Sequence, residues 1–137
     1  MPEPVTGGCQ CGTVRYVLSA APLETYVCHC RECQKQSASA FGISVIAPRA
    51  AFAVTQGGTQ RWSRPTDSGR TLHCHFCTRC GSRVWHESEG RDTVSIKGGT
   101  FDAPVDLTSA FHIWTSRRLA GVVIPPAAKQ YSEEPPA

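Results

Sequence analysis

The sequence lacks the hydrophobic segments that place a protein in or across a membrane. Its apolar stretches fall far short of the roughly 20 residues that span a bilayer as a helix. Residues 1–8 also lack the basic flank and apolar run that are typical of a secretory signal. We therefore expect a cytoplasmic protein with no membrane partner. Its 137 residues fit a single domain over 1–137, with a core over about 5–125.

The sequence also lacks clusters of basic residues. It has 14 Lys and Arg against 11 Asp and Glu, and its formal net charge is +3. Only Arg117 and Arg118 are adjacent in the chain. Proteins that bind nucleic acids concentrate Lys and Arg in a patch or stripe that faces the phosphates. We therefore expect no nucleic-acid partner.

Helical periodicity is scarce, and most of the chain consists of short extended segments separated by turn residues. Val14, Tyr16 and Leu18, for example, alternate with polar residues as in a half-buried strand. The expected strands cover residues 13–19, 23–28, 39–46, 52–55, 59–63, 70–75, 82–87, 92–96, 110–115 and 122–124. Residues 30–37 are polar and suit one short helix. The predicted fold class is mainly β, with at most one short helix.

Three connecting segments have compositions that predict their structure. Gly57 and Gly58 favour a hairpin between the segments 52–55 and 59–63. Residues 97–102, which include Gly98 and Gly99, resemble an exposed, flexible bend. Residues 126–137 are rich in Pro, Ala and Glu, and predict a loosely held tail.

The eight cysteines are more typical of metal ligands than of disulfides, because the cytosol keeps thiols reduced. Cys77 and Cys80 are separated by two residues, and Gly81 allows the backbone to turn after them. Cys9 and Cys11 form a second pair. Four such thiolates provide a closed tetrahedral site for a structural zinc ion, which would join the two halves of the fold. The alternative is two separate pairs of buried or disulfide-prone thiols.

A second group, Cys28, Cys30 and Cys33, provides three more thiols. Cys28 and Cys30 share a face of an extended segment, and a turn entering a helix can bring Cys33 to them. A zinc ion with three protein ligands keeps a fourth position open for water or substrate, as in catalytic sites. A substrate thiol would bind there as its thiolate, below its ordinary pKa of about 8.5. The alternative is a second structural site or a disulfide.

The sequence indicates the roles of Cys74 and of three cations less specifically. Cys74 also forms a Cys-x-x-Cys pair with Cys77, but Gly81 favours the later pair, so Cys74 is most simply a core thiol. A position near the second group would instead let Cys74 complete that metal shell. The three cations that we expect to hold substrate carboxylates are Arg31, Arg79 and Lys97.

The cysteine order resembles that of a known family. The sequence has Gly-x-Cys-x-Cys-Gly at 7–12, Cys-His-Cys-x-x-Cys at 28–33 and Phe-Cys-x-x-Cys-Gly-Ser at 76–82. Further matches lie at 37–41, 99–104 and 112–114. This pattern is similar to that of the glutathione-dependent formaldehyde-activating enzyme family, which also includes centromere protein V.

The resemblance implies an Mss4-like fold of small antiparallel sheets around a structural zinc site. It implies structural zinc at Cys9, Cys11, Cys77 and Cys80. It also implies a second, more labile zinc ion, and catalysis, at Cys28, Cys30 and Cys33. The implied partners are a small thiol such as glutathione and an aldehyde such as formaldehyde, joined to give S-(hydroxymethyl)glutathione.

The sequence therefore predicts a zinc-dependent enzyme of the carbon-sulfur lyase type, similar to S-(hydroxymethyl)glutathione synthase, with two zinc ions per chain. One alternative is a non-catalytic binding module that zinc stabilises. The other is a thiol redox protein in which Cys28, Cys30, Cys33 or Cys74 cycles through a disulfide.

Overall fold

The computed structural model describes residues 4–136, which form ten strands, one α-helix and three short 3-10 turns. The strands are β1 (Val5–Gly8), β2 (Arg15–Leu18), β3 (Glu24–Cys28), β4 (Gly42–Pro48), β5 (Phe52–Gln56), β6 (Thr59–Pro65), β7 (Thr71–Cys77), β8 (Arg83–Ser88), β9 (Thr93–Lys97) and β10 (Phe111–Ile113). The helix is α1 (Arg31–Ser37), and the turns are η1 (Arg49–Ala51), η2 (Gly98–Thr100) and η3 (Thr115–Arg117). The predicted mainly β class with one short helix is confirmed.

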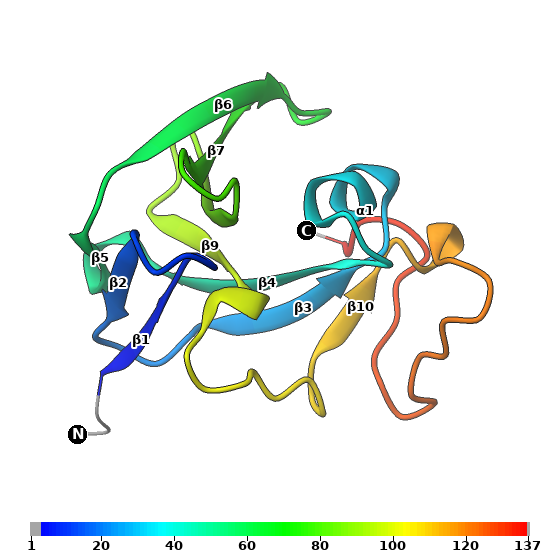
Figure 1. The fold of residues 1–137 in the computed structure, drawn as a ribbon. Helices are drawn as coiled ribbons and strands as arrows, with labels where there is room; N and C mark the ends of the chain where they lie inside the picture. The colour runs from blue at the N-terminus through cyan, green and yellow to red at the C-terminus, as the bar shows by residue number, and fades with distance from the viewer. Residues whose placement is uncertain (1–3, 137) are drawn as a thin grey trace.

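The strands form two sheets (Figure 1). The small sheet has the order β1-β2-β5, and the large sheet has the order β10-β3-β4-β9-β8-β7-β6. Neighbouring strands are antiparallel except for β10 and β3, which are parallel. The large sheet curves, so that β6 and β7 lie opposite β3 and β4, with α1 beside the opening (Figure 1). An ion pair of 3.4 Å between Arg64 on β6 and Glu32 on α1 spans that opening.

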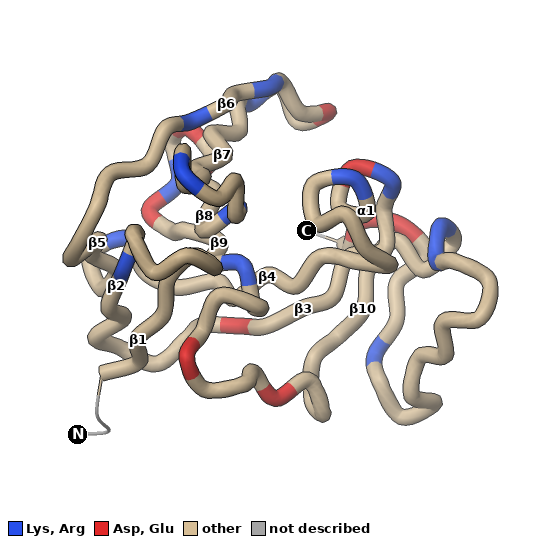
Figure 2. Tube along the Cα trace, viewed as in Figure 1, with Lys and Arg blue, Asp and Glu red and all other residues tan. Residues whose placement is uncertain are grey.

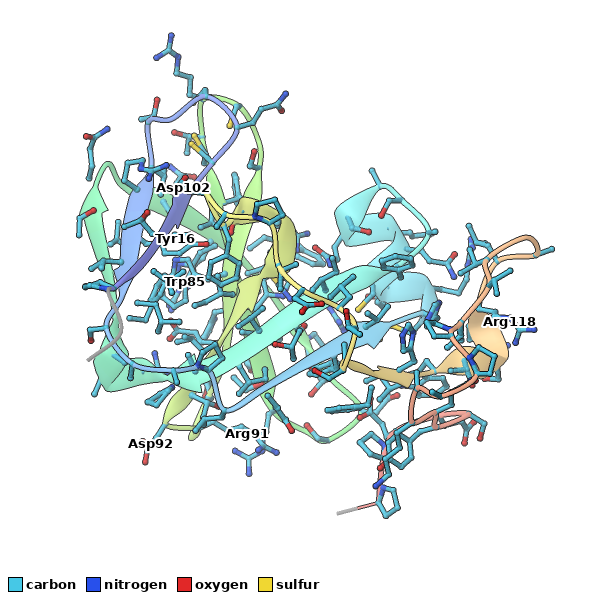
Figure 3. The ribbon with its side chains drawn as sticks, turned by 90° about the horizontal axis from the view of Figure 1, so that it is seen from below. Tyr16, Trp85, Arg91, Asp92, Asp102 and Arg118 are labelled. Atoms are coloured by element: carbon cyan, nitrogen blue, oxygen red, sulfur yellow. The ribbon has the colours of Figure 1, made fainter. Side chains whose placement is uncertain are left out.

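The core lies between the two sheets. Alternate residues of β2 face it, because successive side chains in a strand point to opposite sides, and Tyr16 and Leu18 are each 1% exposed. Tyr16 and Trp85 lie in this interior (Figure 3), where Phe52 packs on both rings at centroid distances of 5.3 and 5.0 Å. The other main contributors are Val14, Val45, Ala47, Val84, Val94 and Ile96. This packing fixes the small sheet on β4, β8 and β9.

The predicted hairpin over residues 52–63 is wrong. Both strands exist, but β5 pairs with β2 in the small sheet, whereas β6 pairs with β7 in the large sheet. Gly57, with a φ of 72°, turns the chain from one sheet to the other. The strand β1 was not predicted, since two of its four residues are glycines. No strand is present at residues 122–124, where one was expected.

The expected exposed bend at residues 97–102 is only partly present: Gly99 and Asp102 are exposed, whereas the other four residues are buried or half-buried. Gly98 is buried within η2, and Phe101 packs edge-on against Tyr16 at a centroid distance of 5.9 Å. The C-terminal segment also makes more contacts than a loosely held tail. Backbone hydrogen bonds of 2.9 Å join His112 to Lys129 and to Tyr131, so this segment runs beside β10.

Charged residues are spread over the whole trace, with Lys and Arg mixed among Asp and Glu (Figure 2). Within residues 4–136, none of the helices has the length and apolar character needed to cross a membrane.

Candidate metal centres

Four cysteines from distant parts of the chain meet at one end of the small sheet. We call them the quartet: Cys9, Cys11, Cys77 and Cys80. Cys9 and Cys11 lie in the loop between β1 and β2. Cys77 ends β7, and Cys80 lies in the turn before β8. Gly81 has a φ of 80°, which a glycine adopts without strain, and its N–H donates to the carbonyl of Cys77 at 2.8 Å. The predicted turn behind these two thiols is therefore present.

The sulfur positions of the quartet fit one tetrahedral zinc ion. Four sulfurs at 2.3 Å from a common tetrahedral centre lie about 3.8 Å from one another. The Sγ atoms of Cys9 and Cys11 are 3.6 Å apart, and those of Cys11 and Cys77 are 3.8 Å apart. The quartet could therefore bind zinc with all four positions filled by protein.

Hydrogen bonds favour the thiolate form of Cys80 in the quartet. The Ser82 hydroxyl lies 3.3 Å from the sulfur of Cys80, and with the Ser82 backbone N–H it lowers the pKa of Cys80 to about 5. The N–H of Val14 donates to the sulfur of Cys9 at 3.2 Å. Zinc binds thiolates rather than thiols, so the acidity of Cys80 suits a metal ligand.

The other three cysteines meet where β3 ends and α1 begins. We call them the trio: Cys28, Cys30 and Cys33, whose sulfurs all lie within 4.8 Å of one another. Cys30 caps α1, because its backbone is extended and its sulfur accepts the N–H of Cys33 at 3.3 Å. The helix ends at Ala38, which has a φ of 51°. The cap and the first turn of α1 thus bring Cys33 back to Cys28.

The three thiols of the trio differ in acidity. Hydrogen bonds from the thiols of Cys28 and Cys33 lower the pKa of Cys30, and the backbone N–H groups at the start of α1 lower it further. The hydrogen bonds of Cys28 with Cys30 and with Cys33, together with burial, raise the pKa of Cys28. One thiolate, on Cys30, is therefore favoured in the trio before any metal binds.

Within residues 4–136, no fourth cysteine, histidine or carboxylate joins the trio. His29 is fully buried but does not join the trio, since its Nε2 lies 2.9 Å from Nδ1 of His112. Cys74 is 1% exposed in β7 and lies outside both cysteine groups. A metal held by the trio would keep a position open for a further ligand.

A cleft of about 490 Å³ lies between the two groups. Residues 36–39 and 41–43, which follow Cys33, form one wall, and residues 80–83 form another, with Lys97 and η2 between them. Gly42 lines this cleft beside the trio: a β-carbon placed on it would lie 3.2 Å from Cβ of Cys33. The trio is therefore directly behind the Gly42 wall of the cleft.

The family model for "Glutathione-dependent formaldehyde-activating enzyme" matches residues 4–117 of the sequence. The chain belongs to the glutathione-dependent formaldehyde-activating enzyme family. A crystal structure of a Rhodobacter sphaeroides protein is similar to this family member over 92% of this chain and 98% of that chain, with a TM-score of 0.56 and 17% sequence identity. That similarity shows a shared fold.

Membership of the formaldehyde-activating family implies a formaldehyde-activating or related function, and both cysteine groups are compatible with zinc.

The cations around the cleft differ from the expected ones. Lys97 lines the cleft, whereas Arg31 and Arg79 are exposed and do not. Arg83 lines it and was not predicted. Arg83 directly follows the Cys-Gly-Ser motif, at the start of β8, and that position is the signal that could have identified it.

Proposed function

We propose that this protein adds a small thiol such as glutathione to formaldehyde or a related aldehyde, with catalysis at the trio. The observation that supports this most directly is the trio itself. Its three sulfurs converge, it has no fourth ligand from the described residues, and it lies against a cleft. Together with the family, this arrangement favours a zinc-dependent enzyme of the carbon-sulfur lyase type over a purely structural site.

In the proposed reaction, the substrate sulfur attacks the carbonyl carbon. The carbon-sulfur bond forms, and the π electrons move to the carbonyl oxygen. That oxygen takes a proton, which balances the one that the substrate thiol releases when it becomes a thiolate, and the product is an S-hydroxymethyl thioether. Zinc bound at the trio would supply the positive charge that keeps the substrate sulfur as its thiolate and polarises the carbonyl. The chain itself contributes three thiolates that hold the metal, and a cleft that holds the substrate beside them.

We propose a structural zinc for the quartet. Its four sulfurs come from the loop after β1, the end of β7 and the turn after it, and they fit a closed tetrahedron, so no position remains for a substrate. We place the reaction in the reducing cytoplasm, since all eight cysteines are free thiols and the proposed metal sites require them in that form.

The experiment that tests this function compares Cys30→Ser with Cys74→Ala. Each zinc-loaded protein is mixed with glutathione and formaldehyde, and the loss of free thiol is followed above the uncatalysed rate. We expect Cys30→Ser to lower the catalysed rate by at least about a hundredfold, because a hydroxyl is a much poorer zinc ligand than a thiolate. Cys74→Ala removes a buried thiol outside both groups and should retain most of the activity. Full activity in Cys30→Ser would exclude the trio as the catalytic site.

A further inference from the structure

The cleft beside the trio contains two cations and no acid. Arg83 and Lys97 both line it, and none of its lining residues is an Asp or a Glu. Within residues 4–136, neither cation forms an ion pair, although Arg15, Arg49 and Arg64 each do. Both side chains therefore line the cleft, and neither has a carboxylate partner among residues 4–136.

Neutral groups hold both cations in place. Nζ of Lys97 donates to the hydroxyls of Ser95 and Ser44, at 3.1 and 3.3 Å. A guanidinium nitrogen of Arg83 lies 3.2 Å from Nε2 of His86, and its Cζ lies 5.5 Å from the centre of the Trp62 ring. Burial, assisted by the charges of Lys97 and Arg83, lowers the pKa of His86 to about 2. His86 is therefore a neutral acceptor for Arg83 and does not balance its charge.

The sheet register places Lys97 on the same face as the trio. Lys97 pairs with Ser44 on β4, and Gly42, two residues earlier on that strand, pairs with Cys28. Residues two apart on a strand, and residues paired across strands, share a face. The ammonium group thus lies close to the position where a substrate sulfur would bind.

Partly desolvated cations are unfavourable unless an anion compensates for the lost hydration. Arg83 and Lys97 are both half-buried, and their hydrogen-bond partners are the neutral groups named above. An arginine also presents a planar pair of N–H donors that match the two oxygens of a carboxylate. Both cations are thus suited to an anionic group on a bound ligand.

We propose that Arg83 and Lys97 form a carboxylate subsite that selects thiol substrates bearing a carboxylate. This inference rests on the proposed function for the thiol itself, and it adds the residues that would recognise the rest of the substrate. The subsite predicts a preference among small thiols that a metal site alone would not give.

The test compares two thiols of similar size, 3-mercaptopropionate and 2-mercaptoethanol, of which only the first has a carboxylate. Their dissociation constants are measured by calorimetry on the zinc-loaded protein, alongside KM and kcat with formaldehyde. We expect the wild type to bind 3-mercaptopropionate at least about tenfold more tightly, as one charged hydrogen bond allows. Arg83→Gln and Lys97→Gln should each lose most of that preference, raising the KM for the carboxylated thiol and leaving kcat nearly unchanged.

Matched controls are Arg61→Gln and Lys35→Gln, which neutralise exposed cations outside the cleft and should keep the preference. Arg83→Lys should restore part of it. An unchanged preference in Arg83→Gln and Lys97→Gln would overturn the proposal. Equal weakening of both thiols with loss of one zinc ion would also overturn it, since the cations would then only balance the charge of the metal site. If carboxylate preference is present but formaldehyde is not consumed, the subsite stands and the proposed function fails.

Discussion

At the scale of single residues, Tyr16 connects the core to the turn that carries Lys97. Its ring packs between Phe52 and Phe101, and its hydroxyl donates to the hydroxyl of Thr100 at 2.8 Å. Thr100 in turn donates to the carbonyl of Lys97 at 2.7 Å. This chain of two hydrogen bonds fixes η2, which forms part of the cleft, onto the small sheet.

Tyr16→Phe should lower the free energy of unfolding at pH 8 by about 1 kcal/mol, the usual net contribution of one such hydrogen bond. Burial raises the pKa of Tyr16 from 10.0 to about 12 in the folded protein. The neutral phenol is thus favoured by folding, so its contribution is complete below pH 10 and is lost as the pH rises toward 12.

Urea unfolding of wild type and Tyr16→Phe between pH 8 and 12 checks this prediction. Above pH 10 the wild type should lose stability more steeply than the variant, because only the wild type contains the Tyr16 phenol. Tyr26 and the other titratable groups are present in both proteins, so their effects cancel in the comparison. A constant difference between the two proteins across this range would contradict the inferred burial of the phenol.

At the scale of elements, the turn η2 packs closely on β4 at Gly98. A β-carbon placed on Gly98 would lie 2.2 Å from Cγ2 and 2.7 Å from Cβ of Ile43. The next residue, Gly99, has no atom within 4 Å of the same position. Gly98 is therefore required by close approach of the chain to β4, whereas Gly99 is not.

Gly98→Ala should destabilise the protein by about 1–3 kcal/mol, because the added methyl group overpacks the contact with Ile43. Gly99→Ala adds the same methyl group to open space and should change the stability by less than about 0.5 kcal/mol. Urea unfolding of both variants provides the measurement. Equal stability of the two variants would contradict the packing of η2 described above.

The elements also show which parts of the fold were predictable. Alternating residues predicted β2 and β9 well, because half-buried strands carry their period in the local sequence. The pairing of β5 and β6 was not predictable in this way, since Gly57 marks a turn but not which sheet each strand joins. The contacts of residues 129–131 with β10 were missed because backbone hydrogen bonds leave no compositional signal.

At the scale of the whole molecule, the quartet connects segments that are far apart in the sequence. It joins the loop between β1 and β2 to the turn between β7 and β8, and so links one end of the small sheet to the large sheet. The convergence of both cysteine groups was predictable, because closely spaced cysteines are typical of metal sites. Arg83 was not, since its role depends on a cleft formed by several distant segments.

The two groups should differ when a single sulfur is removed. Cys77→Ser breaks the closed site between the sheets, so we expect loss of one zinc ion and of several kcal/mol of stability, as for other structural zinc sites. Cys33→Ser changes only the junction of β3 and α1, so we expect loss of the other zinc ion with the fold retained. Circular dichroism and urea unfolding report the state of the fold in each variant.

The zinc content of these proteins, counted by native mass spectrometry, tests the central claim that seven cysteines form two different metal sites. We expect two zinc ions in the wild type, of which a chelator removes one well before the other, and a single, slowly removed ion in Cys33→Ser. One zinc ion in both the wild type and Cys33→Ser, or two ions lost together from the wild type, would contradict the presence of two different sites.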